Sequence, residues 1–388
     1  MVEVMAPQFI PYTPTVEAPE PQFDKNVQTV IEKTERYIAE SVTAGGTGRA
    51  VRDAHAKAYG LVRGEVEILG GLPAEYAQGI YATAGRHGAL IRFSNGSPHA
   101  GADARLGSAT GLALKIFDID GPTLLADEPD SRTFDYTNIN GPIFFCNTVD
   151  HYLFIQDLFL EAPKYFSQGR SGAHRFFGDF VTGKGTLNPE DWAWDEFLAF
   201  FRLSQTPPVN VLLSSYWTMG AVRHGGYIAK VRIAPDSVFA DAVVQRTIDP
   251  TSAAEVFRPA LVAELSEHPY AFDIQVQLCT DLERMPVEDV TVEWLERLSP
   301  FVTVAKLWIP QQDISGEDNL EKVDGLSFTP WRVTADHAPL GNIMRARKEV
   351  YRHSSILRHK LNQQQRTEPR SADELLPFPA KRSRHADR

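Results

Sequence analysis

Stretches rich in β-branched and aromatic residues recur along this 388-residue chain, separated by Gly, Pro and Asp turns. We expect strands at residues 60–69, 89–94, 111–119, 136–146, 226–233, 272–279 and 302–309. Helical periodicity intervenes at about 24–43, 149–161, 187–203, 252–266 and 343–361. Many strands with a few inserted helices predict an α+β protein built on a β-barrel.

The composition narrows the class of protein. Hydrophobic residues at 43%, charged residues at 23% and a net charge of −11 are typical of a soluble globular protein, and argue against a nucleic-acid or membrane-surface binder. No apolar run approaches the roughly 18 residues of a membrane span, and no signal peptide is evident. Cys146 and Cys279 form no C-x-x-C pair, which argues against a thiolate zinc or iron–sulfur site. Buried free thiols in the cytoplasm are expected instead.

The chain divides into three parts by composition. Residues 1–23 hold prolines at 7, 11, 14, 19 and 21 and predict an extended arm, which either stays free or packs on a partner subunit of a homo-oligomer. Residues 24–361 carry the regular patterns and form the expected main domain. Residues 362–388 are polar and contain proline, so they predict a mobile or loosely docked tail.

Arg347, Tyr351 and Arg358 lie four and seven residues apart in the last expected helix. At roughly 100° per residue, all three fall on one narrow stripe. A surface helix often carries such residues without binding anything. However, a phenol ligates iron only as its phenolate, and a guanidinium one turn away favours that charged form. The stripe is therefore a candidate metal-ligand face.

A histidine precedes the first expected strand, in the run Arg52-Asp-Ala-His55-Ala-Lys. A neutral imidazole titrates near physiological pH and suits a general base. A lone histidine before a strand is more often a turn or surface residue. Arg52 and the flanking run set His55 apart from the other ten histidines of the chain.

Two further segments pair polar side chains with strands. In Ile91-Arg92-Phe93-Ser94, alternation puts Arg92 and Ser94 on the same strand face, although Arg92 could also be a surface cation. The run Asn138-Ile-Asn140-Gly-Pro-Ile-Phe-Phe145 places two amides before a Gly-Pro turn, followed by an aromatic pair. Most such pairs are ordinary core aromatics.

These segments, taken in order, resemble those of catalases. The spacing R-x-x-x-Y-x-x-x-x-x-x-R is similar to their proximal helix, and the segment around Asn138 is similar to their Asn-Asn-Thr-Pro-Val-Phe-Phe run. The resemblance covers roughly residues 24–361. It implies a catalase-like antiparallel β-barrel with surrounding helices, and haem b (iron protoporphyrin IX) as cofactor.

The resemblance also implies a role for each cationic or phenolic residue. Tyr351 would ligate the iron as a phenolate, and Arg347 would balance its charge. Arg52, Arg92 and Arg358 would bind the two haem propionates.

On the opposite side of the haem, His55 would deprotonate the incoming peroxide, and the Ser94 hydroxyl would hydrogen-bond to it. An asparagine amide would orient the peroxide. Because counting back from the proline places Ile139 at the family's asparagine, a one-residue shift is needed. We favour Asn140, which adjoins the Gly-Pro turn, with Asn138 as the alternative. The resemblance further implies that three aromatic side chains pack on the porphyrin: Phe144, Phe145 and Tyr152, with Phe154 as an alternative to Tyr152.

Departures from full catalases define the expected activity. The chain is shorter and leaves no room for their C-terminal flavodoxin-like domain, and residues of their NADPH site cannot be matched. It resembles the compact catalase-related haem peroxidases. We expect a peroxidase that reduces hydrogen peroxide or organic hydroperoxides with a small organic donor, with weak catalase activity. The alternatives are an allene oxide synthase-like enzyme that rearranges hydroperoxides and a non-enzymatic haem-binding protein.

Overall fold

A closed β-barrel forms the centre of the protein. The computed structural model describes residues 8–44, 48–105 and 109–377. Within these ranges, nine antiparallel strands pair in the order β5-β4-β3-β2-β1-β9-β8-β7-β6. Because β5 also pairs with β7, the ring closes, and β6 is an extra strand beside β7. The strands are β1 (Ala58–Ile68), β2 (Gly85–Asn95), β3 (Thr110–Ile116), β4 (Phe134–Ile139), β5 (Tyr216–Trp217), β6 (Val222–His224), β7 (Tyr227–Pro235), β8 (Tyr270–Leu278) and β9 (Val302–Ile309).

Strand β2 shows how the barrel is stabilised on both of its faces. Ile91 belongs to the main cluster inside the barrel, whereas its neighbour Leu90 packs with Val323 and Leu326 outside it. Both alternating sets are buried because helices and loops cover the outer surface. This explains why the strand reads as a continuous apolar run in the sequence.

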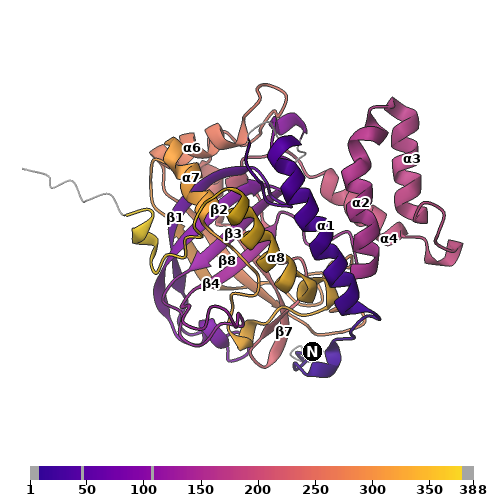
Figure 1. Ribbon diagram of the computed structural model, residues 1–388. Helices are drawn as coiled ribbons and strands as arrows, with labels where there is room; N and C mark the ends of the chain where they lie inside the picture. The colour runs from indigo at the N-terminus through magenta and orange to yellow at the C-terminus, as the bar shows by residue number, and fades with distance from the viewer. Residues whose placement is uncertain (1–7, 45–47, 106–108, 378–388) are drawn as a thin grey trace, which may run out of the picture.

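Helices cover one side of the barrel and form a projecting lobe. They are α1 (Phe23–Ala44), α2 (Val149–Phe166), α3 (Gly169–Thr182), α4 (Trp194–Ser204), α5 (Ser237–Ala242), α6 (Phe257–Glu267), α7 (Glu317–Gly325) and α8 (Asn342–Leu361). Figure 1 shows α1 and α8 side by side across the barrel, while α2, α3 and α4 stand to one side. Helix α8 therefore packs directly against α1.

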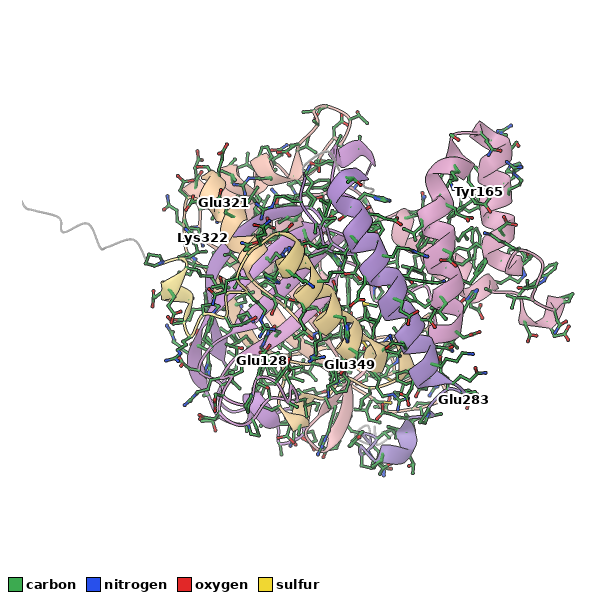
Figure 2. All side chains as sticks on the ribbon, in the orientation of Figure 1. Glu128, Tyr165, Glu283, Glu321, Lys322 and Glu349 are labelled. Carbon is green, nitrogen blue, oxygen red and sulfur yellow. The ribbon has the colours of Figure 1, made fainter. Side chains whose placement is uncertain are left out.

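The lobe has its own aromatic core. Ile155, Leu158, Phe176 and Phe180 are almost completely buried there. The hydroxyl of Tyr165, labelled on the lobe in Figure 2, donates a 2.6 Å hydrogen bond to Asp179 and joins α2 to α3.

The segments at either end of the described chain contact the barrel. The amide of Ile10 donates to Cys279 O at 2.8 Å, and that of Tyr12 donates to Gly226 O at 2.8 Å. Thr367 forms a parallel bridge with Leu326. The remainders of the predicted arm and tail, residues 1–7 and 378–388, lie outside the described residues.

The expected strands all occur, although the bounds of several differ from those predicted. The strand expected at 136–146 ends at Ile139, because residues 140–146 form turns instead. The helix expected at 187–203 begins only at Trp194. Cys146 and Cys279 are buried and free, as expected. In the part of the chain that the structure describes, no helix has the length and apolarity to cross a membrane.

Candidate functional site

One cavity opens between the barrel and α8. It encloses about 740 Å³ of empty space, a volume that includes the solvent at its open mouth. Its walls come from the loop before β1, from strands β2, β3 and β4, and from one face of α8. Polar side chains from distant parts of the sequence therefore face one space.

Helix α8 contributes the Arg347/Tyr351 pair. Nη2 of Arg347 donates to the Tyr351 hydroxyl at 2.7 Å and to Thr137 Oγ1 at 2.8 Å. The guanidinium carbon lies 4.9 Å from the centroid of the Tyr351 ring. Arg347 is buried, so its charge is poorly screened where it contacts the phenol oxygen. Tyr351 and Arg347 thus lie together on the cavity wall, and Arg358 lines it about two helical turns further along α8.

His55 lines the cavity from the loop before β1, at a backbone φ of 55° that non-glycine residues seldom adopt. Its Nδ1 lies 2.6 Å from Asn95 O and 3.2 Å from Ser94 Oγ. Because a carbonyl oxygen only accepts, Nδ1 carries the proton, and Nε2 of the neutral ring is left as a base. Arg92 Nη2 donates to His55 O at 2.5 Å and holds the loop in place.

Burial, together with the nearby charge of Arg92, lowers the pKa of His55 to about 4. The imidazole is therefore neutral at physiological pH and able to accept a proton.

Arg52, Arg92 and Arg358 come from three elements and converge on the cavity. Burial lowers the pKa of Arg92 well below its usual range, and repulsion from Arg52 and Arg358 adds to this. Nε of Arg92 is buried without a hydrogen-bond partner among the described residues. Three crowded guanidiniums in a cavity fit a ligand with more than one carboxylate, as haem has. The residues present thus fit haem.

The two candidate asparagines lie in different places. Asn138 lines the cavity, whereas Asn140 does not. Strand β4 ends at Ile139, and Asn140 Oδ1 accepts from the Thr110 amide at 2.8 Å, which continues the pairing with β3. Asn138 is 3% exposed, and its Oδ1 has no hydrogen-bond partner within the described ranges.

The three aromatic side chains expected against the porphyrin do not line the cavity. Phe144 and Tyr152 pack with residues of α1 and α8 in a separate cluster, and Phe145 packs with the aromatic core of the lobe. Burial raises the pKa of Tyr152. The Phe-Phe run therefore stabilises the junction between barrel and lobe, which is the ordinary role of such pairs.

Sequence reasoning missed an acidic residue in the cavity. Asp53 lines it, and its Oδ1 accepts from the Ser354 hydroxyl at 2.7 Å. Burial raises the pKa of Asp53. Ser354 lies three residues after Tyr351, on the same side of α8, so helical spacing could have identified it. No spacing or motif marks Asp53 in the sequence, where it lies between the candidate residues Arg52 and His55.

Comparison with known proteins places the barrel among catalase structures. No protein-family model and no curated protein matches the chain. Catalase A from Saccharomyces cerevisiae shares 16% identity at a TM-score of 0.57, over 93% of this chain and 70% of that one. A fungal catalase shares 16% sequence identity at a TM-score of 0.51, over 97% of this chain and 73% of that one. A bacterial catalase shares 14% sequence identity at a TM-score of 0.55, over 93% of this chain and 66% of that one. The chain therefore has a catalase-like fold, and the predicted antiparallel barrel with surrounding helices is confirmed.

Proposed function

We propose that this protein binds haem b in the cavity and acts as a compact catalase-related haem peroxidase. It would reduce hydrogen peroxide or an organic hydroperoxide with a small organic donor, with weak catalase activity. One observation carries the proposal. The walls of a single cavity bear a neutral histidine base, a phenol paired with a guanidinium, and three converging arginines.

Tyr351 would ligate the iron, and Arg347 would stabilise the negative charge of its oxygen. Arg52, Arg92 and Arg358 would bind the propionates, which would relieve the repulsion among the three guanidiniums. When bound, haem supplies the redox chemistry that cleaves the peroxide O–O bond.

On the substrate side, Nε2 of His55 would accept the proton from the near oxygen of the peroxide and return it to the far oxygen. Ser94 and the Asn95 carbonyl hold the ring in the tautomer that this requires. We assign the amide that orients the peroxide to Asn138, since this residue lines the cavity and Asn140 does not. An open mouth gives organic donors access, which favours peroxidase turnover.

The same proposal extends to the chain as a whole. Residues 24–361 would form the haem domain, flanked by the arm at 1–23 and the tail at 362–388. Free buried thiols are in keeping with a reducing cytoplasm. Assembly into a homo-oligomer stays a prediction, and the described part of the arm contacts its own barrel.

Tyr351→Phe tests the proposed iron ligand. The purified protein should show a ferric Soret band, and the variant should show a shifted or lost band, because a phenyl ring cannot ligate iron. Tyr165→Phe is the matched control, since it removes a hydroxyl from the lobe whose hydrogen-bond partner among the described residues is Asp179. A colourless protein, or a Soret band unchanged in Tyr351→Phe, would refute the haem site.

Product analysis tests the reaction. With a hydroperoxide and a phenolic donor, we expect oxidised donor and the reduced hydroperoxide. An epoxide or aldehyde formed from a fatty-acid hydroperoxide would assign the rearranging activity instead. A haem-loaded protein that consumes no peroxide would be a haem-binding protein without enzymatic function.

A further inference from the structure

A second group of metal-binding side chains lies at the junction of the barrel and the lobe. Cys146 follows strand β4, His151 lies in the first turn of α2, and Glu196 lies in the first turn of α4. One ligand atom from each lies within 4.8 Å of the others. None of the three lines the cavity described above.

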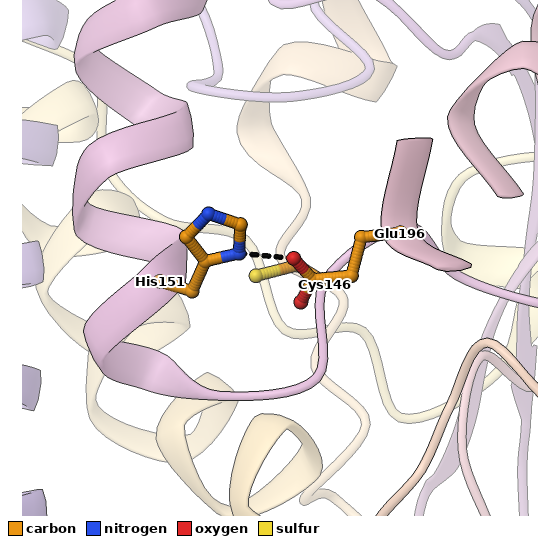
Figure 3. Close-up of side chains that lie close together, drawn as sticks. All are labelled: Cys146, His151 and Glu196. Atoms are coloured by element: carbon orange, nitrogen blue, oxygen red, sulfur yellow. Dashed lines mark ion pairs between the residues drawn. The ribbon is translucent and has the colours of Figure 1, made fainter. Parts of the chain in front are cut away.

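The geometry favours sharing of an ion over nucleophilic catalysis. Nδ1 of His151 forms an ion pair with Glu196 Oε2, and Figure 3 shows the sulfur of Cys146 on the same side of the ring. In a cysteine–histidine–carboxylate relay, the imidazole would contact the thiol through one nitrogen and the carboxylate through the other. Here Nε2 is buried and, among the described residues, has no hydrogen-bond partner.

Neighbouring groups hold the ligand atoms in place. Glu196 is 6% exposed, and its Oε1 accepts from the Asn147 amide at 2.6 Å, which leaves Oε2 directed at the cluster. The His151 ring stacks on Phe154, with centroids 5.6 Å apart and planes inclined by 6°. Within the described ranges, Glu196 forms an ion pair only with His151, so no described arginine or lysine neutralises this buried carboxylate. Such fixed outer contacts are typical of metal sites.

We propose that Cys146, His151 and Glu196 bind one Zn²⁺ ion. A thiolate, an imidazole and a carboxylate together suit this borderline-soft cation. Tetrahedral zinc with ligands at about 2.0–2.3 Å needs ligand atoms roughly 3.5 Å apart, so adjustments on the order of 1 Å complete the site. The ion replaces the thiol proton, and water takes the fourth position.

The ion would link the helical lobe to the barrel, since its ligands come from the β4 loop, α2 and α4. His151 retains a side-chain exposure of 16%, which gives the ion a route from solvent. The absence of a C-x-x-C pair argued against a thiolate zinc site in the sequence. Folding instead joins single ligands that are 5 and 45 residues apart, counted from residues 146 to 151 and 151 to 196.

Zinc analysis of the full-length protein tests the site. After removal of metals by a chelator and equilibration with Zn²⁺, we expect one zinc per chain. X-ray absorption should show one sulfur at about 2.3 Å among nitrogen and oxygen ligands. Cys146→Ser should remove the sulfur signal and weaken binding more than roughly tenfold. Cys279→Ser, which alters the other buried free thiol, should change neither. No bound zinc, or equal binding by Cys146→Ser, would overturn the proposal.

Variants of His151 and Glu196 test the other two ligands, and an alkylation experiment on the unaltered protein avoids variants that fold poorly. His151→Gln and Glu196→Gln should each weaken zinc binding, whereas His174→Gln, on the exposed surface of α3, should not. In the unaltered protein, Zn²⁺ should slow alkylation of Cys146 without slowing that of Cys279; equal slowing, or none, refutes the site. Both readings are independent of haem, so failure of the haem proposal leaves this test intact.

Discussion

At the scale of single residues, His55 depends on a backbone angle and two hydrogen bonds that sequence patterns do not reveal. The neighbouring residues in the sequence mark His55 as a candidate. The positive φ and the hydrogen bond to Asn95 O, in contrast, arise from the tertiary structure. The asparagine shows the same limit. Strand alternation predicts that Asn138 and Asn140 lie on the same face. In the structure β4 ends at Ile139, so Asn138 lies in the strand and lines the cavity, whereas Asn140 lies beyond the strand and does not.

The pKa of His55 predicts the acid limit of turnover. Since the neutral ring persists down to about pH 4, the pH profile of kcat/KM for peroxide should stay flat below the usual histidine pKa of about 6.5 and fall near 4. His55→Gln should lower kcat/KM by roughly 10²–10⁴ and remove that limb. An acid limb near 6.5 would contradict this assignment.

The same pKa predicts how stability depends on pH. Between about pH 6.5 and 4, the unfolded histidine binds a proton and the folded one does not. The free energy of unfolding should therefore fall as the pH is lowered through this window. Urea denaturation of the unaltered protein and His55→Gln should show a smaller decrease in the variant. An identical decrease would mean that other groups determine it.

Gly111 tests how closely the imidazole is positioned. A Cβ added there would lie 2.5 Å from ring atoms of His55, closer than atoms can pack. Gly111→Ala should displace the ring and lower peroxide turnover by about 10²-fold, with the haem spectrum retained. Gly101→Ala, which meets nothing within 4 Å, is the control. Unchanged turnover in Gly111→Ala would show that the position of the ring is not critical.

At the scale of elements, helix α8 was the most predictable part of the site. Its expected range of 343–361 agrees with Asn342–Leu361, because a 20-residue helix with a polar stripe has a clear period. Strand β5, in contrast, has two residues and no period to detect. Helices α3, α5 and α7 were also missed. Their places are set by packing on the lobe and barrel.

The arginine cluster joins three elements, and haem retention should depend on it. Arg92→Leu removes one guanidinium from β2 and a charge-assisted hydrogen bond of about 1.5–3 kcal/mol. Transfer of haem to a scavenging globin should become at least roughly tenfold faster. Arg132→Leu, which alters an exposed residue paired with Asp120, is the control. Equal transfer rates in the two variants would remove Arg92 from the haem site.

At the scale of the whole molecule, a buried ion network connects the barrel to the C-terminal segment. Asp135 of β4 accepts from Lys115 of β3 at 2.8 Å and from Arg332 at 2.5 Å. Arg332 also pairs with Glu128, labelled in Figure 2, and with Glu368 of the C-terminal segment. The first three side chains are completely buried. The network thus holds the segment before α8 against the strands that form the cavity wall.

Removing Arg332 should destabilise the protein much more than removing a surface arginine. In Arg332→Met, Asp135 keeps Lys115 as its one cationic partner among the described residues, and breaking a buried pair costs about 3–5 kcal/mol. The urea midpoint should fall accordingly. Arg132→Met breaks an ion pair whose side chains are 63% and 94% exposed, where solvent screens the charges, and should leave the midpoint nearly unchanged. If both variants unfold at the same urea concentration, hydrophobic packing alone stabilises this part of the barrel and the buried charges add nothing.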